Sequence, residues 1–274
     1  MEAAGLSSDL QPAQATRDSR SNEPFPALEA ERGSLSARVG ERLSGIHPVL
    51  VFLGGIILGY VTLAAATLVV GLVFTETILP LGGVEEADSD AIDWLVDQRT
   101  RTLNDVSFFG SEISGGIVLP ILVVLIGIGF AIRRHWRAAV FALICVALES
   151  ATYRTTVIFV DRERPDVPRL DDLPPDASFP SGHVAASIAV YGGLALLITS
   201  RLTSGVQRAV IWGIAVAIPL VVGVSRMYRG MHHPLDTLAG VLVGIAALAL
   251  VVFVVRVTGV VARAREQETE GASR

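Results

Sequence analysis

The sequence predicts an all-α fold: a polytopic membrane protein built as a bundle of six transmembrane helices. Hydrophobic residues make up 51% of the 274 positions, and they gather in long runs. Aromatic residues are only 6%, so these runs consist mainly of Val, Leu, Ile, Ala and Gly. A helix of about 20 residues crosses a hydrocarbon core of about 30 Å. Because no water pairs the backbone there, we expect such runs to form a helical bundle.

Six runs have the length or the composition of a membrane span. In chain order they are Val49–Phe74, Ile113–Ile132, Ala138–Val160, His183–Thr199, Ala209–Val224 and Leu235–Val255. The first three and the sixth reach full spanning length. The fourth and fifth are shorter, and the fifth contains Pro219. We expect these two inside the bundle, where neighbouring helices satisfy the backbone groups that a proline leaves unpaired.

The segments outside the runs are polar. Residues 1–44 are rich in Ser, Ala, Glu and Arg without periodicity, and they predict a disordered cytoplasmic tail. The membrane domain is predicted over residues 45–258, and a cytoplasmic C-terminal tail over residues 259–274. The longest loop, residues 75–112, carries apolar residues at mixed helical spacing. It predicts a helix that either lies on the membrane surface or packs on the bundle as a connector.

The charged residues indicate an orientation and exclude some functions. All 22 basic residues are Arg, and the mild net charge of -5 does not suggest a nucleic-acid partner. More of the arginines crowd the span ends on the side of the two termini, which predicts that both termini are cytoplasmic. We expect an integral protein of the plasma (inner) membrane. The single Cys145 allows no internal disulfide and no thiolate metal cluster.

Three unusual polar stretches interrupt or flank the apolar runs. DRERPDVPRL (161–170) follows the third run, FPSGH (179–183) opens the fourth, and SRMYRGMHHPLD (225–236) joins the fifth to the sixth. Six alternating spans bring all three stretches to the outer membrane face. We therefore expect their side chains to form one site there.

The start of the fourth run suits an anion. The first amides of a helix lack partners, and the helix dipole favours negative charge there. Gly182 permits close approach to the backbone, and the Ser181 hydroxyl either caps the helix or donates to the same anion. His183 stands beside them as a candidate general acid. Taken alone, this stretch is better explained as an ordinary helix cap with an interfacial histidine.

A carboxylate follows two histidines at the start of the sixth run. His232 lies four residues before Asp236 and His233 three residues before it, so the spacing leaves open which ring is paired. A carboxylate that accepts from one ring nitrogen makes the other nitrogen a better nucleophile. Arg164 and Arg226 complete a basic set that suits the oxygens of a phosphate.

Together these residues resemble the type 2 phosphatidic acid phosphatase superfamily. That family has Lys, six residues and Arg-Pro; then Pro-Ser-Gly-His; then Ser-Arg, five residues, His, three residues and Asp. The second motif is intact at residues 180–183 and the third at residues 225–236, while the first keeps Arg164-Pro165. Three motifs in this order make a chance match improbable, and the resemblance extends over residues 49–255.

The resemblance implies a reaction through a phosphohistidine that needs no metal and no other cofactor. It implies that His232 attacks phosphorus, that Asp236 orients His232, and that His183 protonates the leaving group and then activates water. Charge on the phosphoryl oxygens would be stabilised by four residues: Arg164, Ser181, Gly182 and Arg226.

One position departs from the family pattern. The lysine of the first motif falls at Val157, which cannot bind phosphate. We expect Arg154 or Arg162 to replace it. An arginine inside the membrane is costly and needs a partner, and Glu149 is the candidate for Arg154.

The expected function is hydrolysis of a lipid phosphate at the outer face, with a polyprenyl (di)phosphate, phosphatidate or phosphatidylglycerol phosphate as substrate. A lipid phosphotransferase would use the same residues. A transporter would carry charges midway along several spans, where only Glu149 and Arg154 qualify. A metal site built from the histidines and Asp236 is a further alternative, and a Ser181 protease would leave the arginines unexplained. The sequence gives no prediction of oligomeric state.

Overall fold

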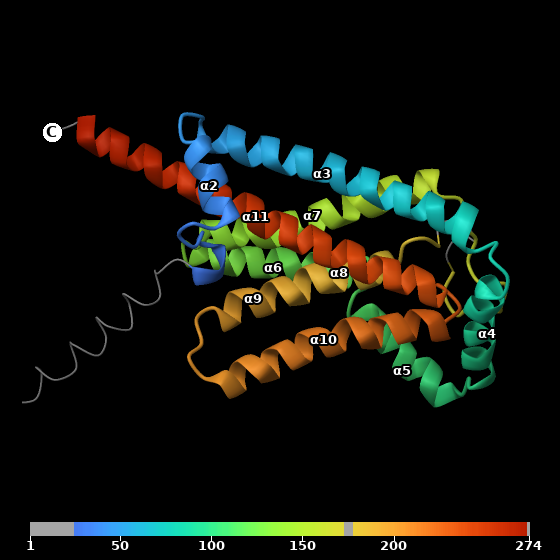
Figure 1. Ribbon diagram of the computed structural model, residues 1–274. Coiled ribbons are helices and arrows are strands. Elements are labelled where there is room, and N and C mark those ends of the chain that lie inside the picture. The colour runs from blue at the N-terminus through green and yellow to red at the C-terminus, as the bar shows by residue number, and fades with distance from the viewer. Residues whose placement is uncertain (1–24, 173–177, 273–274) are drawn as a thin grey trace, which may run out of the picture.

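In the computed structural model, which describes residues 25–172 and 178–272, all regular secondary structure is helical (Figure 1). This confirms the predicted all-α membrane fold. The bundle helices run roughly along one axis, with α4 and α5 gathered at one end and the C-terminus at the other (Figure 1). The elements in chain order are η1 (Pro26–Leu28), α2 (Leu35–Arg42), α3 (Pro48–Val73), η2 (Phe74–Ile78), α4 (Val84–Asp97), α5 (Arg101–Glu112), α6 (Val118–Ile132), α7 (Trp136–Phe159), α8 (Gly182–Ser187), η3 (Ile188–Gly192), α9 (Gly193–Thr199), α10 (Gly205–Tyr228) and α11 (Pro234–Ala272).

Within the described ranges, five helical stretches are long and apolar enough to cross a membrane. They are Pro48–Ile78, Trp136–Phe159, Gly182–Thr199, Gly205–Tyr228 and Pro234–Gly271. The predicted second span, Ile113–Ile132, is shorter than expected, because its helical part α6 has only 15 residues and a rise of about 22 Å. Residues 113–117 follow the end of α5 and form the turn into α6. Of the six predicted spans, five are therefore long enough to cross the membrane within the described residues.

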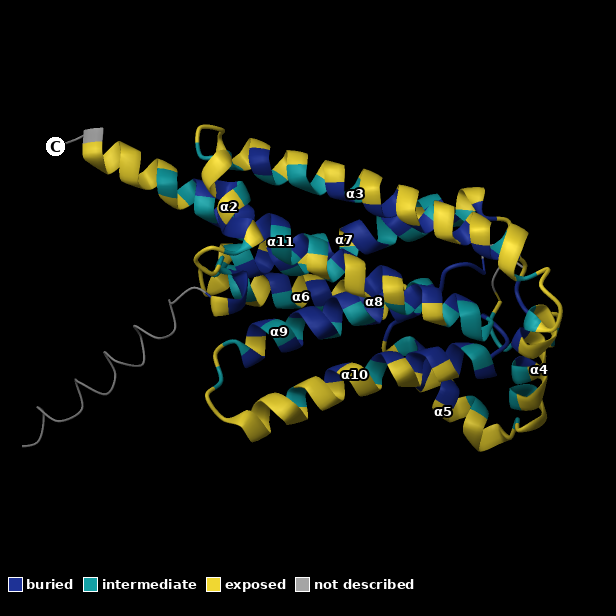
Figure 2. Cartoon of the chain, viewed as in Figure 1, coloured by how far each residue is buried: buried dark blue, intermediate teal, exposed yellow. Residues whose placement is uncertain are grey.

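The apolar side chains divide into a buried core and an outward face. Phe141, Leu197 and Val251 belong to the main core cluster. Large hydrophobic residues on α3 and α10 are exposed instead, with Leu58 68% and Leu220 63% exposed. Figure 2 shows this pattern as nearly continuous exposed faces along both helices. Contiguous exposed apolar surface of this kind fits contact with lipid rather than water.

The ends of the chain differ from the expected tails. The segment 1–44 was expected to be disordered; residues 1–24 lie outside the described residues, but residues 25–44 contain η1 and α2. The apolar side of α2 packs on α11, where Val39 contacts a cluster that includes Val257 and Val261. α11 itself does not end near residue 258 but continues to Ala272. A short amphipathic helix gains order by burying its apolar side against this extended helix.

Two glycines on α11 allow α8 to approach it closely. A Cβ atom at Gly240 would lie 2.5 Å from the Ser181 carbonyl oxygen, and one at Gly244 would lie 2.6 Å from the Ala185 carbonyl oxygen. Small residues four apart are a common means of close helix contact in membranes. The contact brings the head of α8 beside the head of α11, where the Ser181 amide donates to the Asp236 carbonyl at 2.9 Å.

The outer helices α4 and α5 pack on the end of the bundle. Ile92 of α4 is fully buried, and the buried Ser107, Gly110 and Ser111 line one side of α5. A Cβ atom at Gly110 would lie 2.3 Å from Ser225 Oγ of α10, so the two helices touch there. Of the two alternatives for the loop 75–112, the structure favours connector helices packed on the bundle. They cover the end at which the polar stretches meet.

Candidate active site

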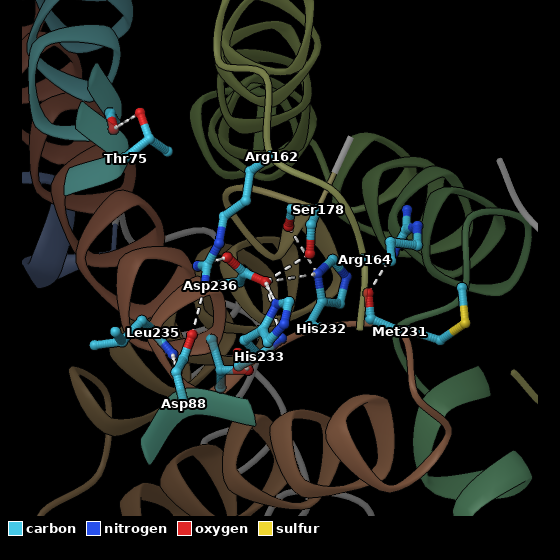
Figure 3. A network of polar contacts seen from close by, with 12 residues as sticks. Thr75, Asp88, Arg162, Arg164, Ser178, Met231, His232, His233, Leu235 and Asp236 are labelled. Carbon is cyan, nitrogen blue, oxygen red and sulfur yellow. Dashed lines mark hydrogen bonds and ion pairs between the residues drawn. The ribbon is translucent and has the colours of Figure 1, made fainter. Parts of the chain in front are cut away.

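The three polar stretches converge at the end of the bundle that α4 and α5 cover. Figure 3 shows Arg162 and Arg164 of the first stretch beside His232 and Asp236 of the third. The loop after α7 supplies Arg162 and Arg164, the turn between α10 and α11 supplies His232, and the first turn of α11 supplies Asp236. The head of α8 joins them through the backbone contact between Ser181 and Asp236. We refer to Arg164, Ser181, His183, Arg226 and His232 as the polar cluster.

His232 is buried, and one of its ring nitrogens is committed to the backbone. Its Nδ1 lies 2.8 Å from the Ser178 carbonyl oxygen. A carbonyl can only accept, so Nδ1 carries the proton and Nε2 bears the free lone pair. Burial, followed by the charges of Arg226 and Arg164, holds the pKa of His232 well below its ordinary 6.5. At neutral pH the ring is therefore uncharged and has the protonation state of a nucleophile.

The resemblance implied that Asp236 orients His232, and in the structure Asp236 supports His232 indirectly, through Ser178. Its Oδ2 is 4.0 Å from His232 Nδ1, while it accepts from Ser178 Oγ at 2.6 Å and from the His233 amide at 2.8 Å. The same carboxylate is ion-paired with Arg162. Ser178 thus bridges the two, since its hydroxyl contacts Asp236 and its carbonyl contacts His232 (Figure 3).

Arg162 holds carboxylates in the structure. Its guanidinium pairs with Asp236 and with Asp88 of α4, and it lies 5.0 Å from the centre of the Phe74 ring. Asp88 also accepts from the Leu235 amide at the head of α11, at 3.1 Å. This network ties the outer helix to the start of the last helix.

The structure does not bring Arg154 into the polar cluster. Arg154 is exposed on α7, whereas Thr152 and Thr156 on either side of it are buried. Glu149, the expected partner of Arg154, is 1% exposed and accepts from Ser150 Oγ at 3.3 Å instead. The five-residue separation explains the difference, because it rotates the two side chains by about 140° around the helix.

The arginines of the polar cluster are fixed by other groups. Arg164 donates to the Met231 carbonyl at 2.6 Å, and burial is the main cause that lowers the pKa of Arg164 from its ordinary value. Arg226 is 3% exposed, and its NH1 donates to Ser111 Oγ at 3.0 Å and to Asp171 Oδ2 at 2.8 Å. Both guanidiniums are thereby held beside His232, whose pKa their charges depress.

Two buried polar atoms in the cluster lack a hydrogen-bond partner within the described part of the chain: Arg226 Nε and Ser181 Oγ. Leaving a buried donor unsatisfied costs about 1–3 kcal/mol. His183 is partly buried and lies within electrostatic range of Arg226 and Arg164, and Ser114 Oγ donates to its carbonyl at 2.7 Å. A ligand with several acceptor oxygens could satisfy these donors.

Sequence reasoning missed the carboxylate beside the second arginine. Asp171 accepts from Arg229 Nε at 2.9 Å and from Arg226 NH1 at 2.8 Å. Burial raises the pKa of Asp171, but the hydrogen bond from Arg229 and the two arginine charges outweigh it and lower the pKa overall. The signal that could have found it is the spacing of Arg226 and Arg229. The two arginines are three residues apart, so they lie on the same side of the chain. Two buried positive charges so close together require an acidic partner.

The other missed residues are Ser178 and Asp88, whose contacts are long in sequence. Ser178 reaches His232 across 54 residues, and Asp88 reaches Leu235 across 147. No local pattern marks either residue. Among the residues described, no three His, Cys, Asp or Glu side chains are grouped so that they could hold a metal ion, so the geometry gives no support to the metal-site alternative.

Comparison with known proteins places these residues in a family. The profile of the PAP2 superfamily matches residues 138–258. The phosphatidylglycerophosphatase B of Bacillus subtilis is 29% identical over 61% of this chain and 83% of its own length. The decaprenylphosphoryl-5-phosphoribose phosphatase of Mycobacterium tuberculosis is 30% identical over 57% of this chain and 82% of its own length.

A solved structure supports the same family assignment as these two relatives. The crystal structure of a transmembrane PAP2 type phosphatidylglycerolphosphate phosphatase from Bacillus subtilis superimposes with a TM-score of 0.59 and 28% identity, over 74% of this chain and 93% of that one. All five residues of the polar cluster lie inside the region that the family profile matches. This chain is an integral membrane protein and belongs to the PAP2 superfamily.

Proposed function

We propose that the protein hydrolyses a lipid phosphate through a phosphohistidine on His232. One observation carries the proposal: the contact of His232 Nδ1 with the Ser178 carbonyl leaves Nε2 as an uncharged nucleophile amid buried donors. A phosphoryl group supplies the acceptor oxygens that Arg226 Nε and Ser181 Oγ need. The named relatives are phosphatases of lipid phosphates, which supports the same reaction class here.

In the first step, His232 Nε2 attacks phosphorus. The new N–P bond forms as the bond to the lipid oxygen breaks, and His183, which takes up a proton when the anionic phosphate binds, gives that proton to the leaving alkoxide. In the second step, neutral His183 takes a proton from water, and the resulting hydroxide attacks phosphorus while the N–P bond breaks. Inorganic phosphate leaves, and both histidines return to their starting states.

The remaining residues stabilise charge and hold the nucleophile. Arg164, Arg226, Ser181 and the Gly182 amide bind the phosphoryl oxygens, whose charge grows in the transition state. Asp236 acts on His232 through Ser178. The Asp236 carboxylate accepts a hydrogen bond from the Ser178 hydroxyl at 2.6 Å. We assign Arg162 to the support of Asp236 rather than to phosphate binding, because its guanidinium is shared between Asp236 and Asp88.

The substrate class follows from the position of the site. The polar cluster lies at a helix end of the bundle, next to faces that carry exposed apolar side chains, so a lipid tail can stay in the hydrocarbon while its phosphate reaches His232. We propose phosphatidylglycerol phosphate, phosphatidate or a polyprenyl (di)phosphate as substrate. The site lies at the end opposite the C-terminus (Figure 1). With cytoplasmic termini, it would face outward in the plasma (inner) membrane.

The test is phosphate release by the purified protein from a panel of these lipids. We expect His232→Ala to abolish release, and we expect rapid quenching of the wild type to trap one phosphoryl group on His232. His47→Ala is the matched control, because that exposed histidine caps α3. Labelled phosphate transferred to a second lipid rather than to water would identify a phosphotransferase. A His232→Ala variant as active as the wild type would refute the proposal.

A further inference from the structure

Tyr153 of α7 packs directly on the head of α8. Ring atoms Cδ2, Cγ and Cε2 of Tyr153 lie 3.0, 3.1 and 3.2 Å from the position that a Cβ atom would take at Gly182. The absence of a side chain at Gly182 therefore makes room for this ring. The contact places an aromatic residue from a membrane helix against the backbone that begins with Ser181 and Gly182.

The hydroxyl of Tyr153 reaches the arginines of the polar cluster. It is hydrogen-bonded to the Arg164 side chain and lies within electrostatic range of Arg226. A guanidinium has donors only, so the Tyr153 oxygen is the acceptor in the bond with Arg164. Its own proton consequently stays available for an acceptor on the other side.

The groups around that hydroxyl are mostly donors. Arg226 Nε and Ser181 Oγ are buried without a partner in the described residues, and the Gly182 amide belongs to the first turn of α8. An anion with several oxygens satisfies all of these donors together. The Tyr153 phenol, which accepts a hydrogen bond from Arg164, can donate one to the same anion and so adds a donor from α7.

We propose that Tyr153 is a further ligand of the substrate phosphoryl group, and that its hydroxyl donates a hydrogen bond to a phosphoryl oxygen. This inference rests on the proposed lipid phosphatase site and adds a residue to it. It also gives α7 a role in the site, although Arg154 on the same helix is exposed. Tyr153 lies one turn before Val157 and is partly buried, whereas Arg154 is exposed. The helix therefore contributes a neutral donor rather than a charge.

The test compares Tyr153→Phe with Tyr60→Phe, in which the phenol is on α3 and contacts α7. Tyr153→Phe keeps the ring against Gly182 and removes only the hydroxyl. Tyr60→Phe removes a hydroxyl bonded to Thr155 Oγ1 of α7 at 2.6 Å, outside the polar cluster. The probes are orthovanadate and inorganic phosphate, measured by calorimetric binding and as inhibitors of phosphate release, with thermal unfolding as a check on folding.

We expect Tyr153→Phe to weaken orthovanadate binding about tenfold or more, as for loss of a hydrogen bond to a charged group, while Tyr60→Phe binds as the wild type does. Unchanged vanadate binding and unchanged kcat/KM in Tyr153→Phe would overturn the inference, even where His232→Ala is inactive and the proposed function stands. Weaker vanadate binding in Tyr153→Phe supports the ligand role even if no lipid in the panel is hydrolysed, in which case only the proposed lipid phosphatase activity fails.

Discussion

The Nδ1 of His232 lies 2.8 Å from the Ser178 carbonyl and 4.0 Å from the carboxylate of Asp236. The backbone therefore fixes the histidine tautomer, and the carboxylate fixes the backbone through the Ser178 hydroxyl. This two-stage support differs from a direct carboxylate–histidine pair, and it makes the consequences of substitution different for Ser178 and for Asp236.

Ser178→Ala is expected to be mild. The variant keeps the carbonyl that accepts from His232 and loses only the hydroxyl bond to Asp236, which costs about 1 kcal/mol of unfolding free energy. Asp236→Ala removes one of the two carboxylates that pair with Arg162 and leaves the Ser178 hydroxyl and the His233 amide without their acceptor. We therefore expect a far larger loss of both phosphate release and thermal stability. Both quantities can be measured on the same detergent-solubilised samples. A Ser178→Ala variant as damaged as Asp236→Ala would contradict the two-stage arrangement.

Arg162 and Asp88 should behave as structural partners. Because the pair is buried, Asp88→Asn leaves a charge partly uncompensated and should lower the unfolding free energy by about 3 kcal/mol. Arg162→Ala should likewise lower the unfolding temperature together with kcat. Asp90→Asn, on an exposed position of the same helix, is the control. An Arg162→Ala variant with normal stability and only a raised KM would instead identify Arg162 as a phosphate ligand.

Asp171→Asn should increase the affinity of the site for anions. The Asp171 carboxylate neutralises part of the charge of Arg226 and Arg229, so its removal strengthens the field that attracts phosphate. We expect inorganic phosphate to inhibit the variant more strongly than the wild type. The pKa of Asp171 is lowered from 3.8, so its ion pairs contribute stability above that pH and lose it only as the pH falls through the lower folded-state value. Equal inhibition of both proteins at neutral pH would argue against this role.

The pH dependence should reflect the depressed pKa of His232. The unfolded chain binds a proton at His232 near pH 6.5, where the folded chain does not, so acid favours unfolding. Stability should fall as the pH drops below about 6.5, by up to about 1.4 kcal/mol per pH unit. The acidic limb of kcat/KM set by the nucleophile should lie well below pH 6.5. Profiles of kcat/KM against pH check this, and a limb centred at 6.5 would mean that His232 titrates normally.

Gly182→Ala should lower activity about tenfold, which corresponds to about 1.4 kcal/mol of transition-state stabilisation. The added Cβ atom would approach the Tyr153 ring to 3.0 Å, so the ring or the head of α8 must shift. Gly129→Ala on α6 is the control, because a Cβ atom there meets nothing within 4 Å. A fully active Gly182→Ala variant would show that the Tyr153 contact tolerates displacement.

Much of the fold was predictable because membrane helices are encoded locally. Long apolar runs predicted α3, α7, α10 and α11, and the bundle is confirmed. The shorter α6 was not predictable from hydrophobicity, since Ile113 and Ile117 are apolar yet lie at the end of α5 and in the turn that follows. Hydrophobicity measures affinity for lipid, whereas a helix end also depends on backbone geometry.

The candidate site was predictable only as far as its motifs reach. Residues such as His183, His232 and Arg226 stand in recognisable local order. Asp88, Ser178 and Asp171 carry no local signal, because their contacts depend on how distant segments pack. The expected replacement of the missing lysine considered only Arg154 and Arg162, because a search for positive charge overlooks a neutral donor such as the Tyr153 hydroxyl proposed above.

The network of Asp88, Arg162 and Asp236 has a consequence for biogenesis. Asp88 lies just after the first span and Asp236 opens the last one. A ribosome must therefore deliver nearly the whole polypeptide to the membrane before His232, the proposed nucleophile, acquires this support. On the proposed mechanism, partly synthesised chains would be inert, and turnover would begin only after the final helix has been inserted.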